Sequence, residues 1–267
     1  MAESRVHATT VIDRREPAGG VIVLGVRASA LAAAAGPGQY VMAIPPGGET
    51  AAVALGVYEA EEERVSLLFF VTGKRTRELA LLRPGDTLAL LGPLGNGFEL
   101  QGSDRDVAIV AGGVGIASVL LPALALRRNG AHVRLFYGAR TASLLVERER
   151  FERAGCETIV TTDDGSEGSR GFVTDALAEA QMPGLFLACG PMPMLRATAD
   201  IALRCGVPAQ LCLEETFACG VGGCWGCVVP ISNASAQAPA FPPSPNGVVY
   251  ARICREGPVF RAGELRW

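Results

Sequence analysis

The sequence predicts a mixed β and α/β fold: an antiparallel β-barrel, a Rossmann-like parallel α/β domain and a small C-terminal domain rich in cysteine. Short β-branched and aromatic runs separated by turn signals fill residues 1–102. Strand-like and helix-like runs alternate from 103 to 207, and the last 49 residues hold four of the eight cysteines. We therefore expect three domains, at 1–102, 103–207 and 208–267.

The barrel domain is predicted from strand-like runs bounded by glycine and proline. The segments "GPG", "PPGG" and "PGD" mark turns between the runs, and this spacing is typical of an antiparallel barrel or sandwich. One short helix is expected from Thr76 to Leu82. The predicted strands cover residues 9–15, 20–28, 38–44, 51–60 and 64–71.

The second domain is predicted from a change of period. Alternating β and α elements indicate a parallel sheet with helices on both faces. The predicted strands cover residues 107–111, 132–137, 158–162 and 185–189. The predicted helices are Ile116–Arg128, Ser143–Ala154, Val173–Ala180 and Met192–Cys205.

Composition excludes several classes of protein. Apolar residues make up 49% of the chain, which is enough for a core, and the net charge of -3 gives no reason to expect nucleic acid or a membrane as partner. The first ten residues hold no apolar run and predict no secretory signal, so we expect a cytoplasmic protein. The uncharged stretch from Val107 to Leu126 contains three glycines and a proline, and we interpret it as a buried strand, turn and helix rather than a membrane span.

The segment "CGVGGCWGC" gives the C-terminal domain its chemistry. Its cysteines follow the pattern C-x4-C-x2-C, and a fourth comes after 26 further residues. This is the ligand spacing of a plant-type [2Fe–2S] cluster, and the glycines let the backbone approach the sulfides closely. Structural zinc, which favours two short C-x2-4-C knuckles, and ordinary thiols remain the alternatives. The four residues are Cys219, Cys224, Cys227 and Cys254.

A glycine turn opens the second domain. The segment "AGGVGIAS" joins a predicted strand to a predicted helix, so backbone N–H groups and a helix N-terminus can face a pyrophosphate. Tight turns alone explain many such segments, and the acidic residue expected about 20 positions later is missing. The candidate nucleotide-binding residues here are Gly112, Gly113 and Gly115.

Two further segments follow strands of the same sheet. Ligands of open α/β sheets bind at the carboxyl ends of strands, so we expect these segments to border a bound ring and the nucleotide's ribose. A buried thiol and a solvated turn are the respective alternatives. The segments are Cys189, Gly190 and Pro191 for the ring, and Asp163 and Asp164 for the ribose.

Together these motifs resemble the ferredoxin–NADP reductase superfamily, and more closely the electron-transfer subunits of class 1B dihydroorotate dehydrogenase. The similar segments include "PGQYV", "GKRTREL", "PLGNGF", "TDDGS", "ACGPMPML", "ACGVGGCWGC" and "ICREGPVF", and they extend from residue 37 to 260. Related subunits of sulfide dehydrogenase, hydrogenase and NADH-dependent ferredoxin–NADP oxidoreductase share much of the pattern.

The resemblance implies an NAD-linked oxidoreductase subunit that carries FAD and a [2Fe–2S] cluster. It also implies a catalytic partner that oxidises dihydroorotate, a heterotetramer and a place in pyrimidine biosynthesis. Hydride transfer to a flavin needs no acid or base, so we name no catalytic side chain. Another oxidoreductase partner and a zinc-stabilised binding module remain as alternative functions.

The flavin positions carried over from the family include departures. The family's arginine and serine fall on Ala51 and Ala54, a basic position falls on Phe70, and Arg75 replaces a glycine. Either Arg75 supplies the missing cation or flavin binding is weakened or lost. The tail "SNASAQAPAFPPSPNG", residues 232–247, is expected to be a flexible excursion. The carried-over flavin positions are Ala51, Ala52, Val53, Ala54, Leu68, Phe69, Phe70, Arg75 and Thr76, and the cluster ligands are the four cysteines named above.

Overall fold

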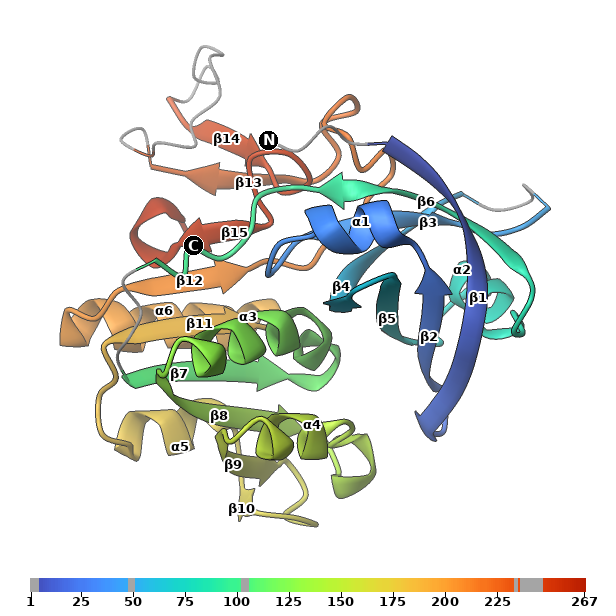
Figure 1. Ribbon diagram of the computed structural model, residues 1–267. Coiled ribbons are helices and arrows are strands. Elements are labelled where there is room, and N and C mark those ends of the chain that lie inside the picture. Colours follow the sequence, from blue (N-terminus) through green and yellow to red (C-terminus); the bar gives the residue numbers. More distant parts are fainter. Residues whose placement is uncertain (1–4, 48–50, 102–105, 233–234, 236–246) are drawn as a thin grey trace.

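The computed structural model describes residues 5–47, 51–101, 106–232, 235 and 247–267. It consists of a β-barrel, a sheet covered by helices and a small hairpin (Figure 1). Most of the excursion expected at 232–247 lies outside the described residues.

The barrel closes through six antiparallel strands in the order β1-β2-β5-β4-β3-β6. Alternate residues along the strands point inward, and Leu24, Leu67 and Leu90 of the barrel core are fully buried. The sequence predicted five of these strands and missed the sixth. The strands are β1 (Arg5–Ala18), β2 (Val21–Arg27), β3 (Tyr40–Ile44), β4 (Val53–Glu61), β5 (Arg64–Phe70) and β6 (Thr87–Leu94).

Two short helices accompany the barrel. Helix α1 (Ser29–Ala34) was not predicted, and its Leu31 is buried against the barrel. Helix α2 (Lys74–Ala80) begins two residues before the expected start because the hydroxyl of Thr76 accepts the backbone N–H of Gly73 at 3.0 Å.

The sheet of the second region has seven strands in the order β10-β9-β8-β7-β11-β12-β15. Its pairs are parallel except for the edge strand β15, which is antiparallel to β12. The four predicted strands are confirmed. The strands are β7 (Asp106–Gly112), β8 (His132–Ala139), β9 (Glu157–Thr162), β10 (Ser169–Arg170), β11 (Leu185–Cys189), β12 (Ala209–Cys212) and β15 (Val259–Arg261).

Helices cover both faces of this sheet. One face packs against α3 and α4, and the other packs against α5 and α6. The stretch from Val107 to Leu126 forms β7, a 3₁₀ turn and the start of α3, as expected. No helix in the described residues is long and apolar enough to cross a membrane. The helices are α3 (Ile116–Arg128), α4 (Arg148–Arg153), α5 (Val173–Glu179) and α6 (Met192–Cys205).

The helix predicted from Ser143 to Ala154 is wrong in its first half. A 3₁₀ turn covers Ala142–Leu144, and only Arg148–Arg153 is α-helical. Glu147 interrupts the helix with a left-handed φ of 64°. Its carboxylate is held by Arg15 and by the Tyr58 hydroxyl of the barrel, the latter at 2.7 Å, so a tertiary contact overrides the local helical pattern.

The C-terminal region divides between two sheets. Strands β12 and β15 lie in the seven-stranded sheet, whereas β13 (Val228–Ile231) and β14 (Val249–Arg252) form a separate antiparallel hairpin. The cysteine loop runs from the end of β12 to β13 and therefore connects the two sheets (Figure 1).

Candidate functional site

The cysteine loop depends on glycine for its path. Gly220 and Gly222 have φ of 67° and 82°, which side chains with a Cβ rarely adopt. A Cβ on Gly220 would also lie 2.4 Å from the sulfur of Met42 on the barrel. The glycines therefore let the loop turn tightly while it packs closely on β3.

The four predicted ligands come together in two pairs of thiols. The thiol of Cys219 interacts with that of Cys224, and the thiol of Cys254 interacts with that of Cys227 and, more weakly, with that of Cys219. Within each pair the two sulfurs are thus neighbours. Cys224 is exposed, Cys219 is half-buried, and Cys227 and Cys254 are buried, so the site lies at the edge of the protein.

The loop backbone surrounds Cys219 with donors. Interactions with the amides of Val221, Cys224 and Gly223 lower the pKa of its thiol to about 6. Burial is the main cause that raises the pKa of Cys254 to about 12. A loop that aims several N–H groups at one sulfur stabilises negative charge, which is what thiolate ligands and cluster sulfides require.

The arrangement of the thiols distinguishes between the two kinds of metal site. No group of three or more His, Cys, Asp or Glu side chains in the described part of the chain is placed to hold a single ion. A zinc ion needs all four sulfurs around one centre, whereas a [2Fe–2S] cluster needs two per iron. The neighbouring thiols of Cys219 with Cys224 and of Cys227 with Cys254 match the two ligands per iron that the cluster needs.

Tyr40 connects the loop to the barrel. It is buried on β3, and its hydroxyl lies 2.7 Å from the carbonyl oxygen of Gly220 and 2.8 Å from that of Cys254. Its ring packs against Phe217 with a centroid distance of 5.1 Å. Both segments that carry the cysteines are thus fixed to one barrel side chain.

Beside Tyr40, a cavity opens between the barrel and the α/β sheet. Tyr40 and Phe69 line one part, of about 450 Å³, while Lys74 and Arg75 line an adjoining part of about 470 Å³. Ala54, Leu55, Phe69, Thr72, Val114, Glu215, Thr216 and Phe217 line both parts.

The lining of this cavity fits FAD. The aromatic rings of Tyr40 and Phe217 provide a surface for a flavin ring, and Lys74 and Arg75 provide two cations for a diphosphate. The absence of an arginine at position 51 therefore does not leave the cavity without positive charge. Bound there, a flavin supplies the exchange between hydride and single electrons.

The predicted flavin positions divide according to this cavity. Ala51 is exposed, and neither Ala51 nor Ala52 lines the cavity. The carbonyl oxygen of Ala52 accepts a hydrogen bond from Nη1 of Arg75 at 2.9 Å. Thr76 both caps α2 and borders the cavity. The predicted positions that line at least one part are Val53, Ala54, Leu68, Phe69, Phe70, Arg75 and Thr76.

The glycine turn and the Cys189–Pro191 segment meet at the carboxyl edge of the sheet. A Cβ on Gly115 would lie 2.1 Å from the carbonyl oxygen of Cys189, and one on Gly112 would lie 2.8 Å from Cδ of Pro191. Gly190 has a φ of 153° and packs against the backbone of Gly112. Only glycine permits the two strand ends to approach so closely, which creates a continuous backbone surface for a nucleotide.

Cys189 is buried at the end of β11 and faces an acidic side chain. Its thiol donates to Oε1 of Glu214 at 3.6 Å, and hydrogen bonding with Cys212 together with burial raises its pKa. Glu214 lines the cavity and is exposed, yet the protein packed around its carboxyl raises its pKa, against the opposing hydrogen bond from Cys189. This Cys–Glu contact lies where the flavin cavity reaches the nucleotide edge.

Asp163 and Asp164 lie apart from these groups. They follow β9 at the same edge of the sheet, but neither lines the flavin cavity. Asp164 accepts the amide of Ser166 at 2.9 Å and its hydroxyl at 2.6 Å, and these bonds lower its pKa. Its side chain therefore stabilises the turn, while a role toward a ribose stays a prediction.

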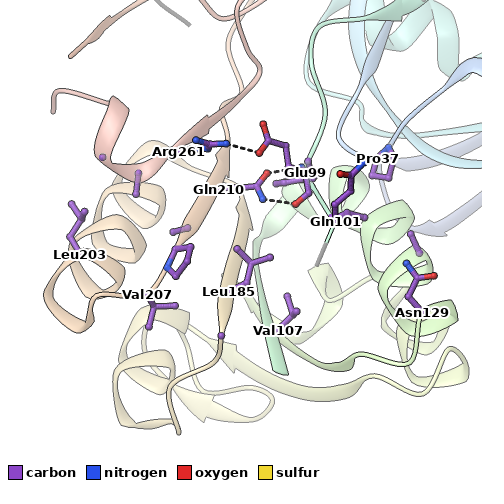
Figure 2. A pocket seen from close by; sticks show the side chains of 18 residues that line it. Pro37, Glu99, Gln101, Val107, Asn129, Leu185, Leu203, Val207, Gln210 and Arg261 are labelled. Atoms are coloured by element: carbon purple, nitrogen blue, oxygen red, sulfur yellow. Dashed lines mark hydrogen bonds and ion pairs between the residues drawn. The ribbon is translucent and has the colours of Figure 1, made fainter. Parts of the chain in front are cut away.

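A larger cavity, of about 1050 Å³, opens at the opposite end of the sheet (Figure 2). Val107, Leu185 and Ala209, at the amino ends of three strands, line it, and none of the predicted site residues does. Glu99 and Arg261 form an ion pair of 2.7 Å at one side. Its size therefore does not make it the candidate site.

Sequence reasoning did not assign roles to Tyr40, Glu214 or Phe217. All three line the flavin cavity, and two of them come from the segment just before the cysteine loop. A signal was available for Glu214, because it follows the carboxyl end of a strand. The role of Tyr40 depends on contacts with residues 180 and 214 positions away, which no local pattern reveals.

Comparisons with known proteins match two regions of the chain to known families. A family model described as the iron-sulfur cluster binding domain of dihydroorotate dehydrogenase B matches residues 214–266, and an oxidoreductase NAD-binding domain matches residues 109–200. The dihydroorotate dehydrogenase B (NAD(+)) electron transfer subunit of Caldanaerobacter subterraneus subsp. tengcongensis is 38% identical over 232 residues, which cover 86% of each chain. That of Geobacillus kaustophilus is 37% identical over 208 residues, covering 77% of this chain and 75% of the relative.

Solved structures share the architecture. A structure of an NADH-dependent reduced ferredoxin-NADP oxidoreductase superposes with a TM-score of 0.83 at 29% identity, covering 100% of this chain and 92% of the other. The ferredoxin reductase of carbazole 1,9a-dioxygenase, with a TM-score of 0.65 at 21% identity, supports the fold alone.

Proposed function

Because this chain belongs to the family of the electron transfer subunits of dihydroorotate dehydrogenase B, we propose that it passes electrons between NAD and a catalytic subunit that oxidises dihydroorotate. It does so through FAD in the cavity between barrel and sheet and through a [2Fe–2S] cluster on Cys219, Cys224, Cys227 and Cys254. The proposal includes a heterotetramer and a place in pyrimidine biosynthesis.

One observation carries the proposal. Tyr40 borders the flavin cavity with its ring and contacts both cysteine-bearing segments through its hydroxyl. The cavity and the cluster loop are therefore separated by a single side chain. This proximity supports direct passage of electrons from one to the other. Val114 of the glycine turn and Glu214, which contacts Cys189, line the same cavity and connect it to the nucleotide edge.

The surface around the loop supports docking of the catalytic subunit. Val221, Trp225 and Val228 expose 47%, 37% and 39% of their surface on the loop and the strand that follows it, next to the exposed Cys224. Exposed apolar side chains grouped in this way mark interaction sites. A partner that covers them would approach the cluster closely.

A cytoplasmic location is part of the proposal. All eight cysteines lie in described residues and none forms a disulfide, which is usual for proteins of the reducing cytoplasm. The nucleotide edge is proposed to take NAD, with Gly113 and the neighbouring glycines facing its pyrophosphate.

A second candidate is an electron-transfer subunit of the NADH-dependent ferredoxin–NADP oxidoreductase type. The structural match to that enzyme over the whole chain favours it. In that case the partner would be a different flavoprotein, and dihydroorotate would not supply electrons.

Reconstitution tests the proposal. The chain is co-expressed with a catalytic subunit of the dihydroorotate dehydrogenase type, and the purified complex is given dihydroorotate and NAD under anaerobic conditions. We expect a stable complex that forms NADH, and a complex with Cys227→Ser that binds equally well but forms none. A stable wild-type complex whose catalytic flavin is reduced by dihydroorotate while no NADH appears would contradict the proposal and favour the second candidate.

A further inference from the structure

Arg252 is a buried cation beside the cysteine loop. It ends strand β14, only 8% of its surface is exposed, and Cys254 follows two residues later. Burial of an arginine is unfavourable unless its donors are satisfied. Three partners surround it, and two of them, Gly222 and Trp225, belong to the loop.

The first partner is the carbonyl oxygen of Gly222, which accepts Nη1 of Arg252 at 2.7 Å. The second is Glu256, whose carboxylate accepts a hydrogen bond from Nε at 3.0 Å and forms an ion pair with Nη2. The third is the ring of Trp225, whose centroid lies 4.5 Å from the guanidinium carbon. The guanidinium is thus fixed in one orientation against the loop.

The bond to Gly222 continues toward a ligand sulfur. The carbonyl of Gly222 and the amide of Gly223 belong to the same peptide unit, and that amide interacts with the sulfur of Cys219 and helps to lower its pKa. A cation that bonds to the carbonyl draws electron density from the peptide and makes its N–H a stronger donor. Arg252 therefore acts on Cys219 through one peptide group.

We propose that Arg252 is a positioning residue that raises the reduction potential of the [2Fe–2S] cluster by polarising the Gly222–Gly223 peptide. The inference rests on the proposed cluster site. Reduction adds one electron and neither makes nor breaks a bond, so the added negative charge is stabilised by stronger donors to the sulfurs. Glu256 opposes this effect, because its carboxylate partly neutralises the guanidinium.

The two members of the ion pair therefore have opposite effects on the same quantity. Arg252→Gln removes the cation and lowers the equilibrium constant for cluster reduction about tenfold, equivalent to about 59 mV for one electron. Glu256→Gln removes the opposing charge and keeps a hydrogen-bond acceptor, so it shifts the potential in the positive direction. If the ion pair were merely structural, both variants would shift the reduction potential in the same direction or would only contain less cluster.

Arg255 provides the matched control. It directly follows Cys254 in the sequence, whereas Arg252 precedes Cys254 by two residues, and its side chain is exposed. Arg255→Gln therefore removes one positive charge near the cluster while it leaves the bond to Gly222 intact. Screening by water predicts a change of less than twofold in the equilibrium constant.

The test is a redox titration of the anaerobically purified chain with dithionite and mediator dyes, followed by electron paramagnetic resonance, with iron measured in each sample. We expect the reduction potential of the cluster to be most negative in Arg252→Gln and most positive in Glu256→Gln. The wild type and Arg255→Gln should lie between them, at nearly the same potential. Full iron content with Arg252→Gln and Glu256→Gln both at the wild-type potential would overturn the inference alone. Wild-type protein without iron would overturn the proposed function and this inference together.

Discussion

The hydroxyl of Tyr40 on the barrel donates to the carbonyl oxygen of Cys254, a cluster ligand 214 residues later, across 2.8 Å. Tyr40 also reaches the carbonyl of Gly220, next to the ligand Cys219. One side chain thus fixes both cysteine-bearing segments against the flavin cavity. The path between the two cofactors depends on a contact between the first and last parts of the chain.

Tyr40→Phe removes this contact and keeps the ring. We expect the free energy of unfolding of the cluster region to fall by about 1–2 kcal/mol, because buried carbonyls lose their donor. The measurement is urea-induced loss of cluster absorbance. Tyr250→Phe, which removes a hydroxyl from a half-buried tyrosine on β14, is the control. Equal midpoints for Tyr40→Phe and the wild type would show that the hydroxyl does not secure the loop.

Arg75→Ala tests the cation of the flavin cavity. Its guanidinium lines the cavity and is oriented by the carbonyl of Ala52. Loss of a charge-assisted hydrogen bond to a diphosphate costs about 1.5–3 kcal/mol, so we expect FAD affinity to fall roughly 10- to 150-fold. Titration of deflavinated protein measures it, with the exposed Arg77→Ala as control. If both variants bind FAD like the wild type, Arg75 does not contact the diphosphate.

The Glu147 contact predicts a dependence of stability on pH. Burial raises the pKa of Glu147, but hydrogen bonds from Arg15 and Tyr58 outweigh it and hold the pKa below its ordinary value. Ionised Glu147 therefore stabilises the fold above the ordinary glutamate pKa of about 4.3, and this contribution disappears as the pH falls through the lower folded value.

Glu147→Gln makes this testable. We expect it to lower the free energy of unfolding by about 1–3 kcal/mol at pH 7 and to flatten the loss of stability below about pH 4.3. The exposed Glu149→Gln on α4 is the control and should behave as the wild type. An acid-side slope that is identical in all three proteins would contradict the assignment.

Cys227→Ser tests the ligand set. Wild-type protein should contain about two irons and two sulfides per chain, and the variant should lose most of both. Cys205→Ser, at an exposed cysteine outside the loop, should keep the full content. Stoichiometric zinc without iron in anaerobic wild-type preparations would instead identify a structural zinc site.

The sequence predicted regular elements well where the pattern was local. The helix from Met192 to Cys205 and the strand from Leu185 to Cys189 have the predicted bounds, because a local pattern of apolar residues and clear turn residues defines them. The cysteine loop was equally readable, since the ligand spacing is itself a sequence property. The domain boundaries remain a prediction. Strands β12 and β15, which come from the predicted cluster region, pair within the sheet of the nucleotide region.

The remaining features depend on distant contacts. Glu147 interrupts a predicted helix because Arg15 and Tyr58 of the barrel hold its carboxylate. The flavin cavity includes Phe217, which comes after the nucleotide region in the sequence. Strand β6 escaped prediction because glycine and proline interrupt its apolar run, although its pairing with β1 and β3 closes the barrel.

The central claim is that electrons pass between NAD(H) and the cluster through the flavin within this one chain, and NADH lets this exchange be followed from the nucleotide side. The most direct measurement is electron paramagnetic resonance of anaerobically purified protein, loaded with FAD and frozen after addition of NADH. We expect the signal of a reduced [2Fe–2S] cluster in the wild type and its absence in Cys227→Ser, although the flavin of that variant is still bleached by NADH. A wild-type sample with full iron and bound FAD, whose flavin is reduced while the cluster stays oxidised, would contradict it.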